Sequence, residues 1–270
     1  MPEHQSWFKF LPGYEAVRAA IERHLGRTVL EHQTQDVQHL GGFLLVFILL
    51  VLLGVMVNRR IRDAKAAVVP DEKLTVRTVF ELVTEMALRQ MEGLMGPREA
   101  RMFLPLIGTC AVFILFSNAL GVVPGFVPPT SNLNVTLACA ALVVLTSEVY
   151  GFVRHGIGYL KEFLGPLNRW YHFFTLLPLL LFAIEVISHT VRMMSLSVRL
   201  MGNMFADHTV VGIFLVLVPF VPVFVPLPVQ LLGVLVVVVQ TVVFCLLSMV
   251  YIAMAIGEEE GHESEHHSGG

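Results

Sequence analysis

Long uncharged stretches alternate with short charged ones along this chain. No Asp, Glu, Lys or Arg occurs from 40 to 57, from 102 to 127 or from 209 to 257. About 20 apolar residues are enough for an α-helix to cross the hydrocarbon core of a bilayer. The pattern therefore predicts an all-α integral membrane protein.

Five membrane-crossing helices are expected. Three are single crossings, at 40–57, 102–122 and 135–153. The segment 173–218 is apolar at both ends and polar in its middle. As one α-helix it would be about 69 Å long, more than twice the thickness of the hydrocarbon core, so it must tilt steeply. A proline-rich turn follows it and returns the chain into a last helix at 229–256.

An alternative splits 173–218 into two spans joined by a loop near 192–208. That topology would place Arg192 and Arg199 outside, against the tendency of Lys and Arg to gather on the cytoplasmic side. The proposed loop also contains no proline, and its only glycine is Gly202. The interpretation as one long helix is therefore favoured.

Basic residues set the expected orientation. The cluster at 59–65 and the loop 154–172 carry Lys and Arg and are assigned to the cytoplasm, whereas the loop 123–134 has neither. Apolar positions between 76 and 91 recur at helical spacing, which indicates an amphipathic helix along the inner membrane surface, ending at Gly96-Pro97. The expected order is an external N-terminal head at 1–39, a first transmembrane helix at 40–57, a cytoplasmic basic segment with the interfacial helix at 58–101, a transmembrane hairpin at 102–153, a cytoplasmic loop at 154–172, a long tilted helix hairpin at 173–256 and a cytoplasmic tail at 257–270.

Composition agrees with this class. Hydrophobic residues make up 55% of the chain and charged residues 14%, and the mean hydropathy is +0.72. Soluble domains carry about 25% charged residues. A soluble enzyme core and a disordered regulator are excluded, and the long apolar helices exclude an outer-membrane barrel. The net charge of −3 does not indicate a nucleic-acid partner.

Polar residues inside 173–256 form a stripe along one side of the long helix. At about 100° per residue, nearly all of them fit within about 120° of the helix surface, and only His208 departs from it. The stripe comprises Glu185, His189, Arg192, Ser195, Arg199, Asn203 and Asp207. A charged side chain in mid-membrane costs roughly 2.5–3.5 kcal/mol, so these groups should face water or a partner.

Some of these residues have an alternative, purely structural reading. Glu185 and His189 lie one turn apart and could simply pair, and Arg192 could reach Glu185 across two turns. On the last helix, Gln240 interrupts an apolar run. A buried amide of this kind is expected to find a hydrogen-bond partner across the helix pair.

Arg199 is different because its stripe neighbours within one turn, Ser195 and Asn203, are neutral. On its own helix only Asp207, two turns on, offers a carboxylate toward it. We therefore expect Arg199 to meet a carboxylate on another protein, or a substrate.

These residues resemble subunit a of the membrane sector of the F-type ATP synthase. The stretch Ser195-Leu-Ser-Val-Arg199-Leu-Met-Gly-Asn203-Met-Phe-Ala is similar to the signature helix of that family. Four further stretches agree, at 117–125, 129–136, 155–162 and 240–251. The resemblance covers about 75–255.

The resemblance implies a function. Members of that family sit beside a rotating ring of c subunits, and two offset aqueous half-channels carry protons to and from a ring carboxylate. It implies that Arg199 separates the half-channels and attracts the ionised carboxylate, that Asn203 and Gln240 flank the arginine, and that Glu185 and His208 line the outer half-channel. A guanidinium fits this task because it stays protonated in a protein and so blocks a direct proton leak.

The resemblance also implies a setting. The chain would be a non-catalytic subunit without cofactor, metal or nucleotide site, partnered by the c-ring, the peripheral-stalk b subunits and the rest of the complex. It would lie in a bacterial inner membrane with its N-terminus outside and its C-terminus in the cytoplasm.

One part of the sequence departs from the family pattern. Many members have an acid at the position of His208 and a facing histidine seven residues before the glutamine. Here Asp207 precedes His208, and position 233 is Gly. We expect Asp207 and His208 to replace the usual relay, because imidazole titrates near neutrality.

Other readings are less favoured. His262-Glu-Ser-Glu-His266 matches a zinc motif in form, but it lies among Gly, Ser and acidic residues, where a solvated tail is expected. A proton-coupled secondary transporter is the alternative function, although internal repeats or broken helices are not evident. A b-type haem protein would need paired axial histidines, which the last helix lacks.

Overall fold

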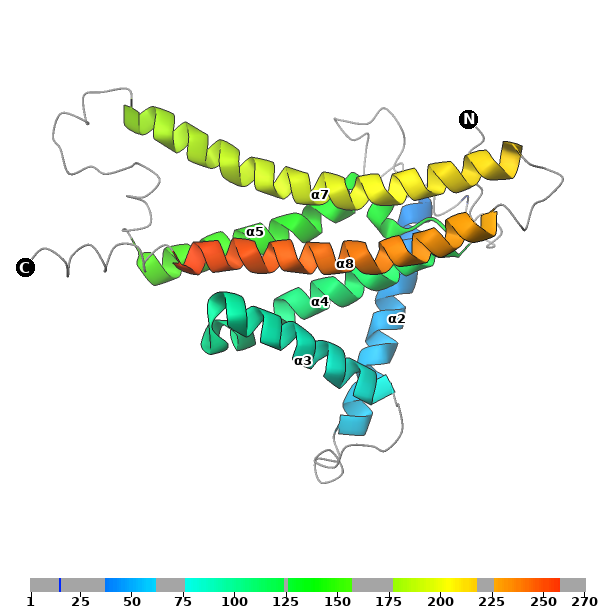
Figure 1. Cartoon of the computed structure of the whole chain (residues 1–270), viewed down its shortest axis with the longest axis horizontal. Coiled ribbons are helices and arrows are strands. Elements are labelled where there is room, and N and C mark those ends of the chain that lie inside the picture. The colour runs from blue at the N-terminus through cyan, green and yellow to red at the C-terminus, as the bar shows by residue number, and fades with distance from the viewer. Residues whose placement is uncertain are drawn as a thin grey trace, which may run out of the picture. The chain divides into compact units, whose positions relative to one another are not determined.

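The computed structural model describes residues 37–61, 76–123, 126–156, 177–217 and 226–257, together with Glu15. Every regular element in these ranges is a helix (Figure 1). The elements are α2 (Val37–Ile61), α3 (Val76–Met95), α4 (Pro97–Val122), the short 3₁₀ helix η2 (Pro129–Ser131), α5 (Leu133–His155), α7 (Leu177–Leu217) and α8 (Pro226–Gly257). The all-α prediction is confirmed for this part of the chain.

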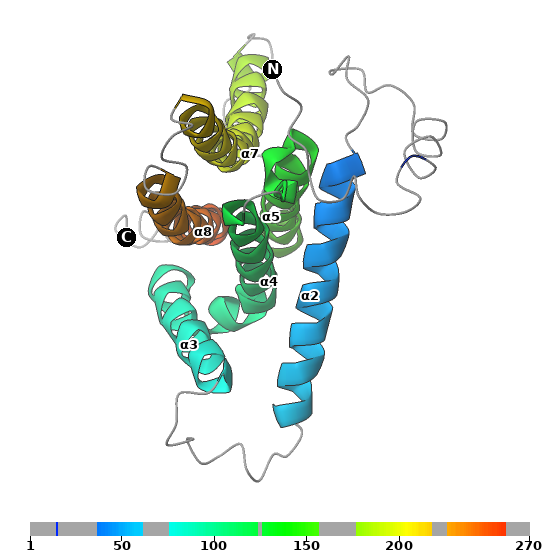
Figure 2. The same cartoon turned by 90° about the vertical axis from the view of Figure 1, so that its right-hand side faces the viewer.

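Five of the described helices are long and apolar enough to cross a membrane, as the sequence predicts. They are α2, α4, α5, α7 and α8. Helix α2, drawn in blue in Figure 2, keeps large apolar side chains such as Leu44, Phe47 and Leu52 exposed. Exposed apolar surface on this scale requires a cover, and a lipid bilayer supplies one.

The polar segment of the chain is one continuous helix. Helix α7 has 41 residues, so the alternative with two spans joined near 192–208 does not occur. Helix α8 has 32 residues, and Pro226 and Pro228 stand in its first turn, where a missing backbone N–H costs no hydrogen bond. The preceding prolines, Pro219 and Pro222, lie outside the described residues.

Contacts divide the chain into two compact units. The first unit is Met1–Leu82, Ala111–Val135 and Leu200–Val242, and the second is Val83–Cys110, Thr136–Arg199 and Val243–Gly270. The boundary passes through α3, α4, α5, α7 and α8, so each of these helices contributes to both units.

The second unit has an apolar core around α3 and α4. Met91, Phe103 and Ile252 are almost fully buried there, and the Phe103 ring meets Tyr150 edge to face at 5.0 Å. Helix α3 ends before Gly96, whose φ of 84° is the left-handed conformation that glycine adopts at helix ends. The chain reverses there (Figure 1), and α4 begins at once with Pro97, five positions before the expected start at 102.

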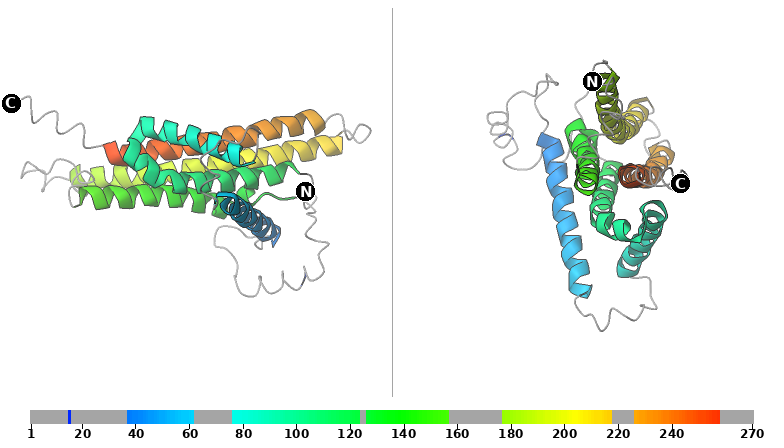
Figure 3. Two further views of the ribbon diagram at one scale, coloured as in Figure 1. Left: turned by 90° about the horizontal axis from the view of Figure 1, so that it is seen from below. Right: turned by 90° about the vertical axis from the view of Figure 1, so that its left-hand side faces the viewer.

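The first unit joins α2 to the short connection before α5. The Cα of Gly42 approaches the Val127 carbonyl so closely that a Cβ there would lie 2.8 Å from the oxygen. Thr130 is fully buried and donates to Asn118 at 2.6 Å. Within the same unit, α7 and α8 run side by side and antiparallel (Figure 3).

Candidate functional site

Asn203 and Gln240 join α7 to α8 inside the first unit. The Asn203 side-chain nitrogen donates to Gln240 Oε1 at 2.5 Å, and Gln240 is only 3% exposed. The predicted hydrogen bond of Gln240 across the helix pair is confirmed. Among the described residues, nothing accepts a hydrogen bond from the buried Nε2 of Gln240.

One turn beyond Asn203, Asp207 lies against the backbone of α8. A Cβ on Gly233 would come within 2.9 Å of Asp207 Oδ2 and 3.2 Å of Oδ1. The carboxylate therefore fills the space that a side chain at 233 would occupy. A histidine at 233 would collide with Asp207 in this position. His208 follows on α7, but its side chain is outside the described part.

The polar stripe of α7 has two differently placed edges. Asn203 and Asp207 are half-buried, whereas Ser195 and Arg199 are exposed. No ion pair or hydrogen bond links the Arg199 guanidinium to any residue in the described ranges. The side chain on which the sequence argument depends most is therefore presented outward, toward whatever covers α7.

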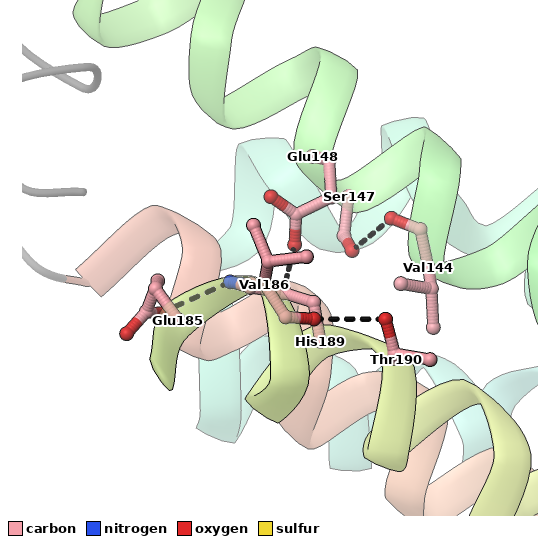
Figure 4. A network of polar contacts seen from close by, with 7 residues as sticks. All are labelled: Val144, Ser147, Glu148, Glu185, Val186, His189 and Thr190. Atoms are coloured by element: carbon pink, nitrogen blue, oxygen red, sulfur yellow. Dashed lines mark hydrogen bonds and ion pairs between the residues drawn. The ribbon is translucent and has the colours of Figure 1, made fainter. Parts of the chain in front are cut away.

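The second unit contains a cluster of two carboxylates and an imidazole (Figure 4). Glu185 Oε1 lies 3.1 Å from Nε2 of His189, one turn further along α7, so the pairing of these two residues is confirmed. On the other side of the ring, Glu148 of α5 brings Oε1 to 2.6 Å from Nδ1. One imidazole thus stands between two carboxylates from two helices.

Arg192 is engaged elsewhere in the second unit. Its guanidinium carbon lies 5.8 Å from the centre of the Tyr251 ring on α8, within the range of a cation–π contact. Two fully buried hydroxyls, those of Thr136 and Ser197, also meet at 3.0 Å and link α5 to α7.

Glu148 is a functional candidate that was not predicted from the sequence. It is the only carboxylate in the apolar run of α5, and a lone charge inside a membrane span is itself a sign of function. Its partner His189 is distant in sequence, so only the packing of α5 against α7 shows that the two belong together.

Comparisons with known proteins agree on one family. A family model described as the ATP synthase A chain matches residues 42–253. An ATP synthase subunit a from Sorangium cellulosum is 41% identical over 265 residues, covering 97% of this chain and 100% of that protein. Proteins of the same name from Trichlorobacter lovleyi (42% over 217 residues, 80% of this chain and 85% of that protein) and, as subunit a 1, Syntrophotalea carbinolica (38% over 245 residues, 87% and 96%) also match. These matches give no support to a secondary transporter.

Proposed function

Because the chain belongs to the ATP synthase subunit a family, the proton-translocating subunit of the membrane sector, we propose that its α7–α8 pair carries protons past Arg199 to a partner carboxylate. The partner is a carboxylate on a ring of c subunits that turns against α7. The observation that carries the proposal is the exposed guanidinium of Arg199, which pairs with none of the described residues, on a helix otherwise suited to the membrane.

The physical role of Arg199 follows from its permanent charge. A guanidinium attracts an ionised carboxylate and favours its ionised form, so a ring carboxylate arriving at Arg199 gives up its proton. The guanidinium itself does not pass that proton on, because it cannot be deprotonated in a protein. Arg199 therefore separates two water-filled paths while the ring carboxylate moves between them.

Asn203 and Gln240 support this site as a pair of amides. Their hydrogen bond leaves the buried Nε2 of Gln240 with a donor to offer, and a carboxylate or an ordered water is its natural acceptor. Ser195, one turn before Arg199 on the same exposed edge, contributes a hydroxyl to that surface.

The two half-channels take different parts of α7. Asp207 and His208 follow Arg199 along the helix and serve the outer half-channel. Glu185 precedes Arg199 by about 20 Å of helix, so it serves the inner one. The resemblance implies the outer half-channel for both Glu185 and His208. We propose the inner one for Glu185 instead, because the two residues lie on opposite sides of Arg199 along one helix.

The proposal also includes a setting for the chain. We assign it to a bacterial inner membrane with the N-terminus outside and the C-terminus in the cytoplasm, bound to the c-ring and to peripheral-stalk b subunits. Helix α3 lies along the inner surface, since Val83 and Met86 remain exposed and apolar while Met91 packs into the core. The chain moves protons and leaves the chemistry of ATP to other subunits.

The test replaces Arg199 with Ala in the assembled complex. We expect ATP synthesis driven by a proton gradient to fall to background and passive proton permeability of the vesicles to rise, because the barrier between the paths is gone. Insertion should persist, since removing a membrane charge lowers the insertion cost by roughly 2–3 kcal/mol. Synthesis and permeability are measured on the same vesicles.

Arg89→Ala is the matched control. Arg89 is exposed on α3, where it pairs with Glu85 at 2.7 Å, and such surface pairs contribute about 0–1 kcal/mol. Arg199→Lys should support little more ATP synthesis than Arg199→Ala, because lysine lacks the planar guanidinium and loses its proton more readily when desolvated. Near-normal synthesis in Arg199→Ala would remove the basis of the proposal.

A further inference from the structure

His189 of α7 has a carboxylate at each of its two ring nitrogens. Glu148 Oε1 lies 2.6 Å from Nδ1, and Glu185 Oε1 lies 3.1 Å from Nε2. Figure 4 shows the ring between the two acids, one from α5 and one from α7. The sequence predicts Glu185 and His189 only as a local pair, and Glu148 changes the chemistry of the group.

Two carboxylates around one imidazole require an additional proton. A neutral imidazole has one N–H donor and one lone-pair acceptor, so one ring nitrogen would direct its lone pair at a carboxylate oxygen. Both contacts are attractive only when the ring is an imidazolium, or when one of the acids is protonated. In either case the cluster holds one proton more than a neutral ring with two ionised acids.

The three side chains of the cluster differ in exposure. The Glu185 side chain is 40% exposed, whereas those of Glu148 and His189 are 24% and 18% exposed. Glu185 is therefore the most accessible member of the cluster, and the imidazole is the most shielded. His189 lies about 15 Å before Arg199 along the continuous α7.

The nearest cations along the two helices of the cluster contact other groups. On α7 the next cation is Arg192, whose guanidinium lies over the Tyr251 ring of α8. On α5 the next cation is Arg154, which pairs with Glu99 of α4 at 3.1 Å. Both cations are thus engaged with other groups.

We propose that Glu148, His189 and Glu185 form a proton-holding cluster in the inner half-channel, which takes a proton from cytoplasmic water through Glu185 and passes it along α7. The step moves a proton from a water-borne acid to the cluster and then onward, and only O–H and N–H bonds break and form. The inference rests on the proposed function and adds Glu148 and His189 to its proton path.

The test measures ATP-driven proton pumping by inverted membrane vesicles, whose outer face is the cytoplasmic face. Pumping is recorded from about pH 6 to about pH 9, a range in which imidazole groups titrate. In Glu148→Gln and in His189→Gln we expect pumping to fall several-fold at the alkaline end, because one of the groups that hold the proton is gone and protons in the water are scarce. At the acidic end, where protons are abundant, both variants should pump like the parent.

Two further variants show whether a change in the pH profile is specific to the cluster. Glu85→Gln removes an exposed carboxylate on α3 and should leave the pH profile unchanged. Glu185→Gln changes the most exposed member of the cluster, so it should assemble even if the buried variants do not, and we expect the same alkaline loss. The amount of complex in the vesicles is measured for every variant by immunoblotting.

The outcomes separate this proposal from the proposed function. An equal loss at every pH means a structural role and overturns the cluster, as does an unchanged profile in all three cluster variants. If Arg199→Ala is inactive in the same vesicles while the profiles stay unchanged, only the cluster proposal fails. If Arg199→Ala pumps normally, the proposed function itself fails.

Discussion

Asp207 occupies the space that a side chain at position 233 would need, so the effects of mutations at 207 and 233 should not be additive. Gly233→Ala places a Cβ 2.9 Å from Asp207 Oδ2, so the Asp207 side chain must turn away, and we expect somewhat less assembled complex and slower ATP synthesis, with a cost of about 1 kcal/mol. Adding Asp207→Ala should relieve much of the assembly defect, which a double-mutant cycle measures as non-additivity. Gly108→Ala is the matched control, since no atom lies within 4 Å of a Cβ there. Equal amounts of assembled complex in Gly233→Ala and Gly108→Ala would contradict the packing argument.

Asp207 and His208 are also expected to move protons. Alanine at both positions should slow proton uptake from the outer side several-fold while the complex still assembles, because the only two ionisable groups that follow Arg199 on α7 are removed. Proton flux into vesicles containing the complex measures this. Thr209→Ala, at the next position, should leave the flux unaltered, since that hydroxyl donates only to the Phe205 carbonyl of its own helix. Unchanged flux in the double variant would refute the relay.

At the scale of elements, Asn203 and Gln240 form a hydrogen bond between α7 and α8. Cysteines at these two positions, in a chain without its native cysteines, should cross-link readily because the two side chains are in hydrogen-bond contact. Replacing 240 by its neighbour 239 gives the control, since Val239 is 51% exposed and points to another face of α8. Gel mobility of the oxidised protein reports both results. Efficient cross-linking of the 203–239 pair alone would mean that α8 is rotated about its axis.

At the scale of the whole molecule, the orientation in the membrane can be tested with single cysteines. Arg59, at the end of α2, and Asn134, at the start of α5, are both exposed. We expect Arg59→Cys to react with an impermeant thiol reagent only from the cytoplasmic side and Asn134→Cys only from the outside, as the basic cluster at 59–65 demands. Labelling from the same side would end the five-span topology. A cysteine at 130 would report poorly, because Thr130 is fully buried.

Local pattern alone determined much of this protein. The uncharged runs are long enough to span a bilayer, and five described helices have that length and composition. The unbroken polar stripe, with no proline in it, predicted the continuity of α7, and Gly96-Pro97 marked the end of α3. Helix formation depends on residues within a few turns of one another, which is why these features could be read from the sequence.

Contacts between helices were decided only by the tertiary structure. A helical wheel predicts the polar stripe of α7, but it does not predict which edge of the stripe is buried. In the structure Asn203 contacts Gln240, whereas Arg199 is exposed. Glu148 meets His189, and Asp207 fills the place of a side chain at 233, because the packing of whole helix faces brings together residues that no sequence spacing relates. A helical period states which residues share a face, and the side chains of the neighbouring helix decide what that face meets.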